Sequence, residues 1–196
     1  MRARGRDVAI ATGDAALFDA RVSAQFGIES SRNLPNPRVI MADLLVKLYD
    51  LPWEKCAVPE DVEVRRAFAA EKRLVAQWVA GNFGERWASE CEIAFARSPV
   101  ACFIATNRLH VLGFSTYDTT ARGFFGPTGV AVDARHKGIG RALLCAALQD
   151  MAAQGYAYGI IGATTSVEFY RREVKAIEIP DSTPGFYGGM LKPTHA

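Results

Sequence analysis

The residues in this sequence that are best suited to chemistry lie in a glycine-containing turn, residues 135–141, which reads Arg-His-Lys-Gly-Ile-Gly-Arg. An apolar stretch, residues 128–132, leads into the turn, and residues 139–154 follow it with apolar side chains at helical spacing. The first turn of a helix has backbone N–H groups without intrahelical acceptors, and it carries the positive pole of the peptide dipoles. Glycines let a phosphate approach this backbone closely, and the cationic side chains add charge. The turn therefore predicts a diphosphate-binding site.

The spacing within the turn narrows the choice of phosphate ligand. A Walker loop requires Gly-Lys-Ser/Thr, which is absent, and a dinucleotide fingerprint requires a third glycine where Leu143 stands. The arrangement Arg135-x-x-Gly138-x-Gly140 instead resembles the coenzyme A signature of the GNAT superfamily of N-acetyltransferases, Arg/Gln-x-x-Gly-x-Gly/Ala between a strand and a helix. The alternative is a basic strand-to-helix turn whose glycines serve packing alone.

The elements that must hold this turn are predicted from hydrophobic periodicity and from turn residues. Helices are expected at residues 70–82, 85–97, 139–154 and 167–174, and strands at residues 62–68, 100–106, 110–118, 124–132, 156–163, 176–179 and 186–191. Pro127 lies inside a predicted strand but cannot donate a ladder hydrogen bond, so we expect a bulge or a local splay there.

The order of these elements resembles the GNAT fold. That fold is α+β (α/β three-layer), with a mixed, mostly antiparallel central sheet, helices on both faces and a splayed strand pair. The resemblance implies an acetyltransferase domain over residues 62–196. Residues 1–61 are expected to form an N-terminal extension that packs on this domain or on a partner subunit, with helical patterns at residues 15–26 and 39–49.

The resemblance also implies a cofactor, acetyl-CoA, and the residues that hold it. In the family the pantetheine arm lies between two parting strands and bonds to the backbone, while the glycine turn wraps the diphosphate. Carried over by position, the cofactor-binding residues are Val130, Ala131, Val132, Arg135, His136, Lys137, Gly138, Ile139, Gly140 and Arg141.

Two catalytic roles follow from the same resemblance. The family places a tyrosine on the helix after the fifth strand as the acid that protonates the leaving thiolate. Here Phe169-Tyr170 fits that pattern, so Tyr170 is the expected acid, with a half-buried packing role as the alternative. The family's usual basic carboxylate is absent from residues 124–132, and Glu90 on the second predicted helix is the expected base. The alternatives are Glu92, Asp118, Tyr117 and a chain of water molecules.

The function implied is transfer of an acetyl group from acetyl-CoA to a primary amine of a small molecule or peptide, by direct attack in a ternary complex. Aromatic residues in the predicted acceptor region, such as Phe83 and Phe124, favour an acceptor with an apolar part. The alternative is a non-catalytic acyl-CoA-binding regulatory module of the same fold.

Composition sets the remaining expectations. The 196 residues carry a net charge of +2, which gives no reason to expect nucleic acid or an acidic membrane surface as a partner. Hydrophobic residues make up 49% of the chain, as in ordinary globular proteins, and no apolar run is long enough to span a bilayer. The four cysteines show neither zinc spacing nor a disulfide framework, so Cys145 is interpreted as a small core residue and no metal is expected. We therefore expect a cytoplasmic protein that could form a homodimer.

Overall fold

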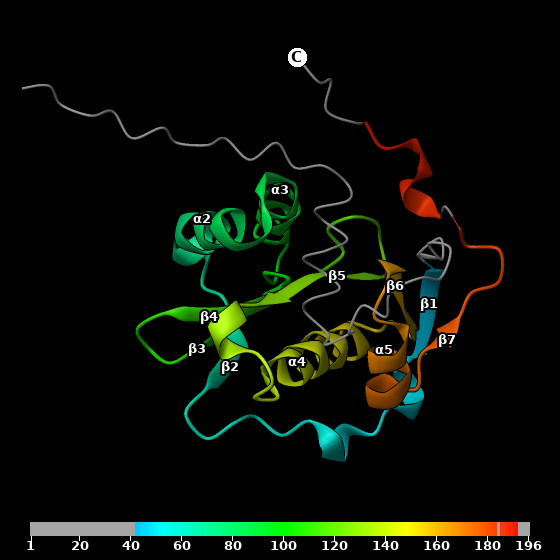
Figure 1. The fold of residues 1–196 in the computed structure, drawn as a ribbon, viewed down its shortest axis with the longest axis horizontal. Helices are drawn as coiled ribbons and strands as arrows, with labels where there is room; N and C mark the ends of the chain where they lie inside the picture. The colour runs from blue at the N-terminus through cyan, green and yellow to red at the C-terminus, as the bar shows by residue number, and fades with distance from the viewer. Residues whose placement is uncertain (1–41, 184, 192–196) are drawn as a thin grey trace, which may run out of the picture. The chain divides into compact units, whose positions relative to one another are not determined.

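The computed structural model describes residues 42–183 and 185–191, which fold around one mixed sheet (Figure 1). The helix expected at residues 15–26, and most of the expected extension, lie outside the described residues. The spatial order of the strands is β2-β3-β4-β5-β6-β1-β7, and neighbours pair antiparallel except for β5 and β6, which are parallel. The strands are β1 Ala42–Lys47, β2 Glu63–Arg66, β3 Cys102–Thr106, β4 Val111–Tyr117, β5 Phe124–Val130, β6 Tyr158–Thr164 and β7 Ile177–Glu178.

Helices cover both faces of the sheet (Figure 1). On one face lie α2 (Lys72–Phe83) and α3 (Glu85–Ala94), and on the other lie α4 (Ile139–Ala153) and α5 (Val167–Val174). The predicted three-layer α+β class, with a mixed, mostly antiparallel sheet, is confirmed.

The helix after the glycine turn supplies much of the core. Ile139, Leu143, Leu148 and Met151 of α4 are each no more than 1% exposed. Their spacing puts them on one face of the helix, which packs against β3, β4 and β5. Because α4 is anchored by this apolar face along its length, the position of its N-terminus is fixed relative to the sheet.

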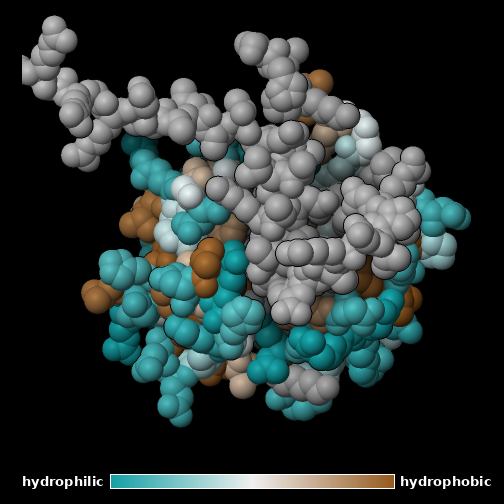
Figure 2. Space-filling model, in the orientation of Figure 1, coloured by the Kyte–Doolittle hydropathy of each residue, from teal (hydrophilic) through white to brown (hydrophobic). Residues whose placement is uncertain are grey.

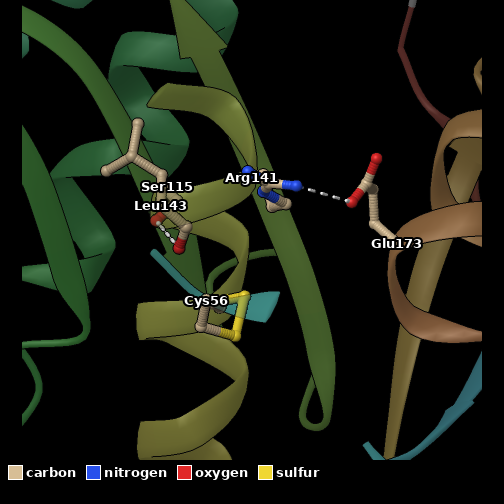
Figure 3. Close-up of a disulfide and its surroundings, with 6 residues drawn as sticks. Cys56, Ser115, Arg141, Leu143 and Glu173 are labelled. Carbon is tan, nitrogen blue, oxygen red and sulfur yellow. Dashed lines mark hydrogen bonds and ion pairs between the residues drawn. A yellow bond between two sulfur atoms is a disulfide. The ribbon is translucent and has the colours of Figure 1, made fainter. Parts of the chain in front are cut away.

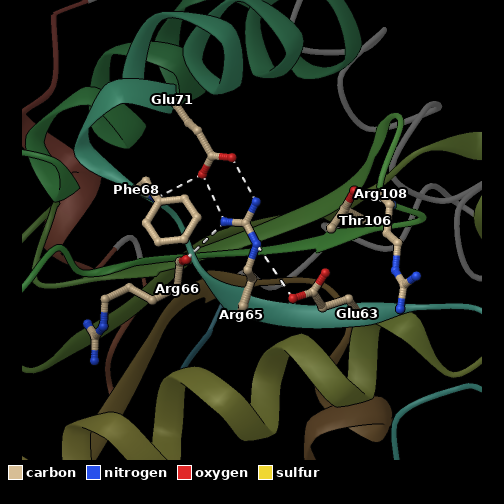
Figure 4. A network of polar contacts seen from close by, with 7 residues as sticks. All are labelled: Glu63, Arg65, Arg66, Phe68, Glu71, Thr106 and Arg108. Carbon is tan, nitrogen blue, oxygen red and sulfur yellow. Dashed lines mark hydrogen bonds and ion pairs between the residues drawn. The ribbon is translucent and has the colours of Figure 1, made fainter.

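An ion-pair network joins the edge strand β2 to the start of α2 (Figure 4). Both terminal nitrogens of Arg65 donate to the carboxylate of Glu71, at 2.9 and 2.7 Å. Glu71 also accepts a hydrogen bond from the backbone N–H of Phe68, at 2.8 Å. The Arg65 hydrogen bonds lower the pKa of the Glu71 carboxyl, which therefore stays ionised to a lower pH than an unpaired glutamate.

The parallel pair β5 and β6 is joined only at its beginning. Phe124 pairs with Ile160 and Phe125 pairs with Ile161. Beyond these residues the two strands are no longer paired. The peptide bond between Gly126 and Pro127 is cis, and the β4–β5 register shifts nearby. The bulge expected at the proline is therefore confirmed.

Two threonines account for the displaced backbone of β5. The hydroxyl of Thr116 donates to the carbonyl of Pro127 at 3.1 Å, and the hydroxyl of Thr119 donates to the carbonyl of Gly126 at 2.8 Å. These bonds satisfy carbonyls that a regular ladder would have paired. They tie the bulged part of β5 to the β4 side, away from β6.

Two predicted elements were wrong. Residues 39–49 were expected to be helical, but Ala42–Lys47 form β1, which lies between β6 and β7. One face of this strand is buried, at Ala42, Leu44 and Val46, and Asp43 on the other face is buried too. The strand therefore lacks the alternation of buried and exposed residues that marks a half-exposed strand in a sequence. The described part of the sheet therefore begins at Ala42, ahead of the residues 62–68 expected to start it. Residues 186–191 contain a 3-10 turn, Phe186–Gly189, instead of a closing strand.

The surface of the described part is mixed in character. On the face seen in Figure 2, apolar residues are scattered among hydrophilic ones, as is normal for proteins in water. Among the described residues, no helix combines the length and the apolar character needed to cross a bilayer. No three or more His, Cys, Asp or Glu side chains of that part gather in a group that could hold a metal ion.

Candidate functional site

The glycine turn begins where β5 ends and closes at the N-terminus of α4. Gly138 occupies the cap position with φ 83°, a left-handed conformation that glycine adopts without strain. No side chain caps the first turn of the helix. Among the described residues, the first backbone N–H with an acceptor is that of Ala142, which bonds to the carbonyl of Gly138 at 3.1 Å. The N–H groups of residues 139–141 are therefore free to bind an anion.

Two cations fold over the backbone of the turn. The Nε of Arg135 donates to the carbonyl of Val130 at 3.1 Å, and the Nζ of Lys137 donates to the carbonyl of Asp133 at 3.3 Å. His136, with φ 63°, and Lys137 are exposed. Each bond uses only part of the donor capacity of its side chain, so both cations keep donors for a ligand.

Arg141 is the least satisfied cation at this site. Its Nε is buried without a hydrogen-bond partner, and its Nη1 lies 3.8 Å from Oε2 of Glu173, beyond hydrogen-bond distance (Figure 3). A buried unpaired donor is costly, and an anion at the turn would satisfy it. The free N–H groups, the glycines and this orphaned donor together fit the diphosphate of coenzyme A.

The other predicted cofactor residues lie along the same path. Val130 and Ile139 are buried, at 7% and 1% exposure, so their side chains belong to the core. The N–H of Ala131 bonds to the carbonyl of Leu112 at 2.9 Å, whereas Val132 is exposed. The turn thus brings the predicted residues together, but no pattern in the sequence indicated that Glu173 of α5 lies near Arg141. A glutamate near the end of an exposed helix resembles any solvated acid.

Tyr170 lies where β5 and β6 part. It is 7% exposed, and its ring packs edge-on against Phe125, at 6.3 Å between centroids, and against Phe169, at 5.0 Å. Phe125 is also the last β5 residue paired with β6. Burial raises the pKa of the Tyr170 hydroxyl well above its usual value near 10. Among the described residues this hydroxyl has no hydrogen-bond partner, and because its pKa is raised it is protonated at neutral pH.

Glu90 approaches from the opposite face of the sheet, on α3. It accepts a hydrogen bond from the hydroxyl of Thr120 at 3.2 Å. Burial raises the pKa of the Glu90 carboxyl, and the Thr120 hydrogen bond and the charge of Arg86 reduce that rise. A raised pKa brings a carboxylate closer to the basicity that proton transfer from an amine requires.

Aromatic side chains surround the parted strands on the Glu90 face. A Cβ at Gly129 of β5 would lie 2.4 Å from Cζ of Phe83, so the Phe83 ring rests directly on that backbone. Phe83 stacks on Trp87 at 5.2 Å between centroids. On β6, a Cβ at Gly162 would lie 2.9 Å from the ring of Tyr187. Glycines in both strands therefore admit aromatic rings to this face.

Asp118 and Tyr117, two alternatives for the base, are engaged elsewhere. The Asp118 side chain is fully buried and accepts hydrogen bonds from Arg97 at 2.6 Å and from the Tyr156 hydroxyl at 2.5 Å. Tyr117 donates to Asp150 at 2.5 Å. Both side chains hold together the far end of β4. Glu92, a third alternative, pairs with Lys72 at 3.1 Å. Glu90 therefore stays the predicted base.

The interpretation of Cys145 as a simple core residue was wrong. Its sulfur forms a disulfide with Cys56, and the two Cα atoms are 5.7 Å apart (Figure 3). The partners are 89 residues apart in sequence, and neither belongs to a closely spaced pair. Only the fold, which brings the segment before β2 against α4, places them together. Cys91 and Cys102 remain free and buried.

Comparisons with known proteins agree with this architecture. No family model matches the chain, and no curated protein matches it. Among solved structures it is similar to the GCN5-related glucosamine N-acetyltransferase region of a fungal multi-domain GH3 β-N-acetylglucosaminidase, with a TM-score of 0.59, 15% identity and 85% of this chain covered. It is also similar to a GCN5-related N-acetyltransferase from Sphaerobacter thermophilus, with a TM-score of 0.56, 19% identity and 82% covered. A third is a Drosophila melanogaster protein, with a TM-score of 0.53, 15% identity and 70% covered.

The matches cover 22%, 53% and 47% of those three chains, less than two thirds in each case. At these identities the likeness is one of fold. The described part of this protein therefore has the fold of the GCN5-related N-acetyltransferases, which is the GNAT fold that the glycine turn and the order of elements predicted.

Proposed function

We propose that this chain is an acetyl-CoA-dependent N-acetyltransferase that acts on a primary amine of a small molecule or peptide. The observation that carries the proposal is the parting of β5 from β6 beside a glycine turn with free N–H groups and an orphaned arginine donor. A chain that needed the turn only for packing would not leave a buried donor unpaired.

The diphosphate would be held by the N–H groups of residues 139–141 together with Arg135, Lys137 and Arg141. The pantetheine arm would bond to the free edge of β5 near Val130. When bound, acetyl-CoA supplies an acetyl thioester, and the residues of the chain do the rest.

Acid and base would act from opposite faces of the sheet. Glu90 accepts a proton from the ammonium group of the acceptor at its carboxylate, which its raised pKa favours. Tyr170 holds a proton at its hydroxyl, where burial retains it, and releases it toward the departing sulfur. A proton is thus taken up on the α3 face and delivered from the α5 face, and the amine attacks between the two.

The acceptor would lie against the aromatic side chains of the α3 face. Phe83, Trp87 and Tyr187 offer flat apolar surface, and Glu90 offers a negative charge. This combination favours an amine that carries an apolar or aromatic group.

Titration calorimetry with acetyl-CoA tests the cofactor assignment. Arg141→Ala removes the orphaned donor, and loss of a charge-assisted hydrogen bond predicts a rise in Kd of about tenfold or more. Arg171→Ala is the matched control, because Arg171 lies on α5 and pairs with Glu168. Equal affinities in the two variants and the parent would contradict the phosphate site.

Release of free coenzyme A thiol on addition of a panel of amines tests the activity. Thiol release that depends on an amine supports the transferase. Tight binding of acetyl-CoA without release by any amine would favour a non-catalytic acyl-CoA-binding module.

A further inference from the structure

A buried carboxylate of β1 lies next to the parted strands. Asp43 is 7% exposed, and its Oδ1 accepts a hydrogen bond from the backbone N–H of Ala163 of β6 at 2.7 Å. The backbone of Asp43 is held as well, because its N–H donates to the hydroxyl of Ser182 and its carbonyl accepts from the N–H of Ile179, both at 2.9 Å. A carboxylate is costly to bury, so a buried one whose hydrogen bond joins two strands indicates a positional role.

Asp43 faces a bulge in β6. The residues before and after Asp43 in β1 pair with Thr164 and Ile161 of β6. Two residues of β6, Gly162 and Ala163, therefore lie opposite Asp43 alone. Ala163 has φ 45°, a left-handed conformation that a residue with a Cβ rarely adopts. The hydrogen bond to Asp43 fixes the N–H of this strained residue.

The bulge begins where β6 leaves β5. Ile161 is the last residue of β6 that pairs with β5, and Gly162 follows it directly. A bulge ends regular pairing and bends the strand that carries it. Two threonine hydroxyls tie the displaced backbone of β5 to the β4 side, and Asp43 ties β6 to β1 in the corresponding way. The gap between β5 and β6 thus has a tie at each of its edges.

The bulge also lies close to the α3 face of the sheet. A Cβ at Gly162 would lie 2.9 Å from the ring of Tyr187, and a Cβ at Gly185 would lie 3.3 Å from Oδ2 of Asp43. Burial raises the pKa of Tyr187, and the charges of Glu90 and Asp43 add to that rise. Asp43 is therefore near the residues of the α3 face that would receive the acceptor.

We propose that Asp43 is a positioning residue, which holds β6 away from β5 through its bond to Ala163 and so keeps the gap open for the acylated pantetheine end of the cofactor. The inference rests on the proposed function, because it takes the pantetheine arm to lie along the free edge of β5. Asp43 acts through the backbone of β6 and not on the reacting atoms. Without its bond Ala163 can relax to a negative φ, and β6 can move toward the unpaired backbone groups of β5.

Titration calorimetry on the full chain measures the effect of Asp43→Ala on two ligands. Acetyl-CoA reaches the gap, whereas 3′-phosphoadenosine 5′-diphosphate carries a diphosphate but lacks the pantetheine arm. If the replacement leaves the gap open in about one tenth of the molecules, the Kd of acetyl-CoA rises about tenfold. The Kd of the fragment, which does not distinguish the two arrangements, should change by less than about twofold.

Three replacements test the bulge itself. Asp43→Asn keeps an acceptor oxygen in place, so the Kd of acetyl-CoA should stay within about twofold of the parent value. Ala163→Gly, added to Asp43→Ala, allows the left-handed φ without strain and should recover part of the lost affinity. Ala163→Val leaves Asp43 in place but should weaken binding of acetyl-CoA as Asp43→Ala does, because a β-branched residue avoids positive φ. It takes the place of Asp43→Ala if that variant does not fold.

Amide hydrogen exchange in the cofactor-free protein measures the tie directly. The N–H of Ala163 should exchange at least about tenfold faster in Asp43→Ala than in the parent. Asp150→Ala is the matched control, because Asp150 near the C-terminal end of α4 accepts hydrogen bonds from Arg66 and Tyr117, each at 2.5 Å. This variant should have a lower Tm, with both Kd values and the exchange of Ala163 unchanged.

The outcomes separate the inference from the proposed function. Parental affinity for acetyl-CoA in Asp43→Ala, or in Ala163→Val if Asp43→Ala does not fold, would overturn the inference and leave the proposed function standing. An equal loss of affinity for the fragment would also overturn it, because it would show a general disturbance of the site. Unchanged exchange at Ala163, or no recovery on adding Ala163→Gly, would do the same. Absence of acetyl-CoA binding in the parent protein would overturn both.

Discussion

Replacement of Tyr170 by phenylalanine separates a chemical role from a packing role. The hydroxyl has no hydrogen-bond partner among the described residues, and the ring keeps its contacts with Phe125 and Phe169 in the variant. Loss of an unpaired hydroxyl should change the free energy of unfolding by less than about 0.5 kcal/mol. Loss of a general acid should lower turnover by about 10²–10⁴-fold.

Tyr156→Phe is the matched control, because the Tyr156 hydroxyl is hydrogen-bonded and lies outside the proposed site. It donates to the buried carboxylate of Asp118 at 2.5 Å, at the end of β4 and away from the parted strands. A partly exposed hydrogen bond to a charged group is worth about 1–2 kcal/mol. In a chain of this size that corresponds to a fall in Tm of about 2–8 °C. Turnover at a permissive temperature should stay unchanged.

The assay combines thermal unfolding with thiol release at saturating acetyl-CoA and amine. The expected result is a double dissociation, in which one variant loses rate but not stability and the other loses stability but not rate. Because Tyr170 is not placed to hold the cofactor, the Kd of acetyl-CoA in Tyr170→Phe should change by less than about twofold. Parental turnover in Tyr170→Phe, or equal losses of turnover in both variants, would refute the assignment of the acid.

Three further predictions concern other parts of the site and the fold. Gly129→Ala should destabilise the protein by about 1–3 kcal/mol, because the new Cβ would lie 2.4 Å from Phe83. Gly81→Ala, in α2, has nothing within 4 Å of the new Cβ and should stabilise the protein by about 0.5–1 kcal/mol. Urea unfolding of both variants measures the two free-energy changes. Glu90→Gln should abolish the rise of turnover with pH. Because burial raises the folded-state pKa of Glu90, its ionised form destabilises the fold above pH 4.5, and the neutral glutamine removes that cost. Thermal unfolding should therefore show a higher Tm for the variant at pH 7 and no gain below pH 4.5. Glu71 has a lowered folded-state pKa, so its contribution to the free energy of unfolding is present above pH 4.5 and is lost as the pH falls through the folded-state pKa. Glu71→Gln should therefore lower Tm more at pH 7 than at pH 3. Equal losses of Tm at the two pH values would contradict the pairing with Arg65.

The sequence predicted the elements with a single clear periodicity. The helix after the glycine turn has a wide apolar face, and the structure places α4 at Ile139–Ala153 with that face buried. Pro127 predicted a local departure from the ladder, and the register shift lies beside it. In each case a local chemical rule, either an apolar stripe or a missing N–H, determines the local structure.

Other features depend on contacts that no local rule contains. Leu74 of α2 is 60% exposed although it is a large apolar residue, because the helix rests on the sheet through Val75 and Val79. The same limit applies to β1, whose apolar residues do not alternate because Asp43 and Leu45 on its second face are buried or half-buried as well. Which cysteine meets Cys145, and that Glu173 approaches Arg141, depend on how distant segments meet.

The position of the glycine turn between a strand and a helix could be predicted because its glycines and cations are concentrated in one short stretch of sequence. The binding of a diphosphate by these residues stays a prediction. The roles of Tyr170 and Glu90 stay predictions. Their positions on opposite faces of the sheet are consistent with those roles, but the residue types alone could not have placed them there.

The position of β1 has a consequence for how the chain must be assembled. Leu45 of β1 pairs with Ile160 of β6 and with Ile177 of β7. During synthesis β1 therefore has no strand partner until these later segments have been made. Until β6 leaves the ribosome, an apolar segment remains unpaired, in the state in which nascent chains most readily aggregate or recruit chaperones. Because both pairings of β1 are with strands near the end of the described residues, we expect this protein to fold slowly. A separately made peptide containing β1 should complement a chain that begins after it.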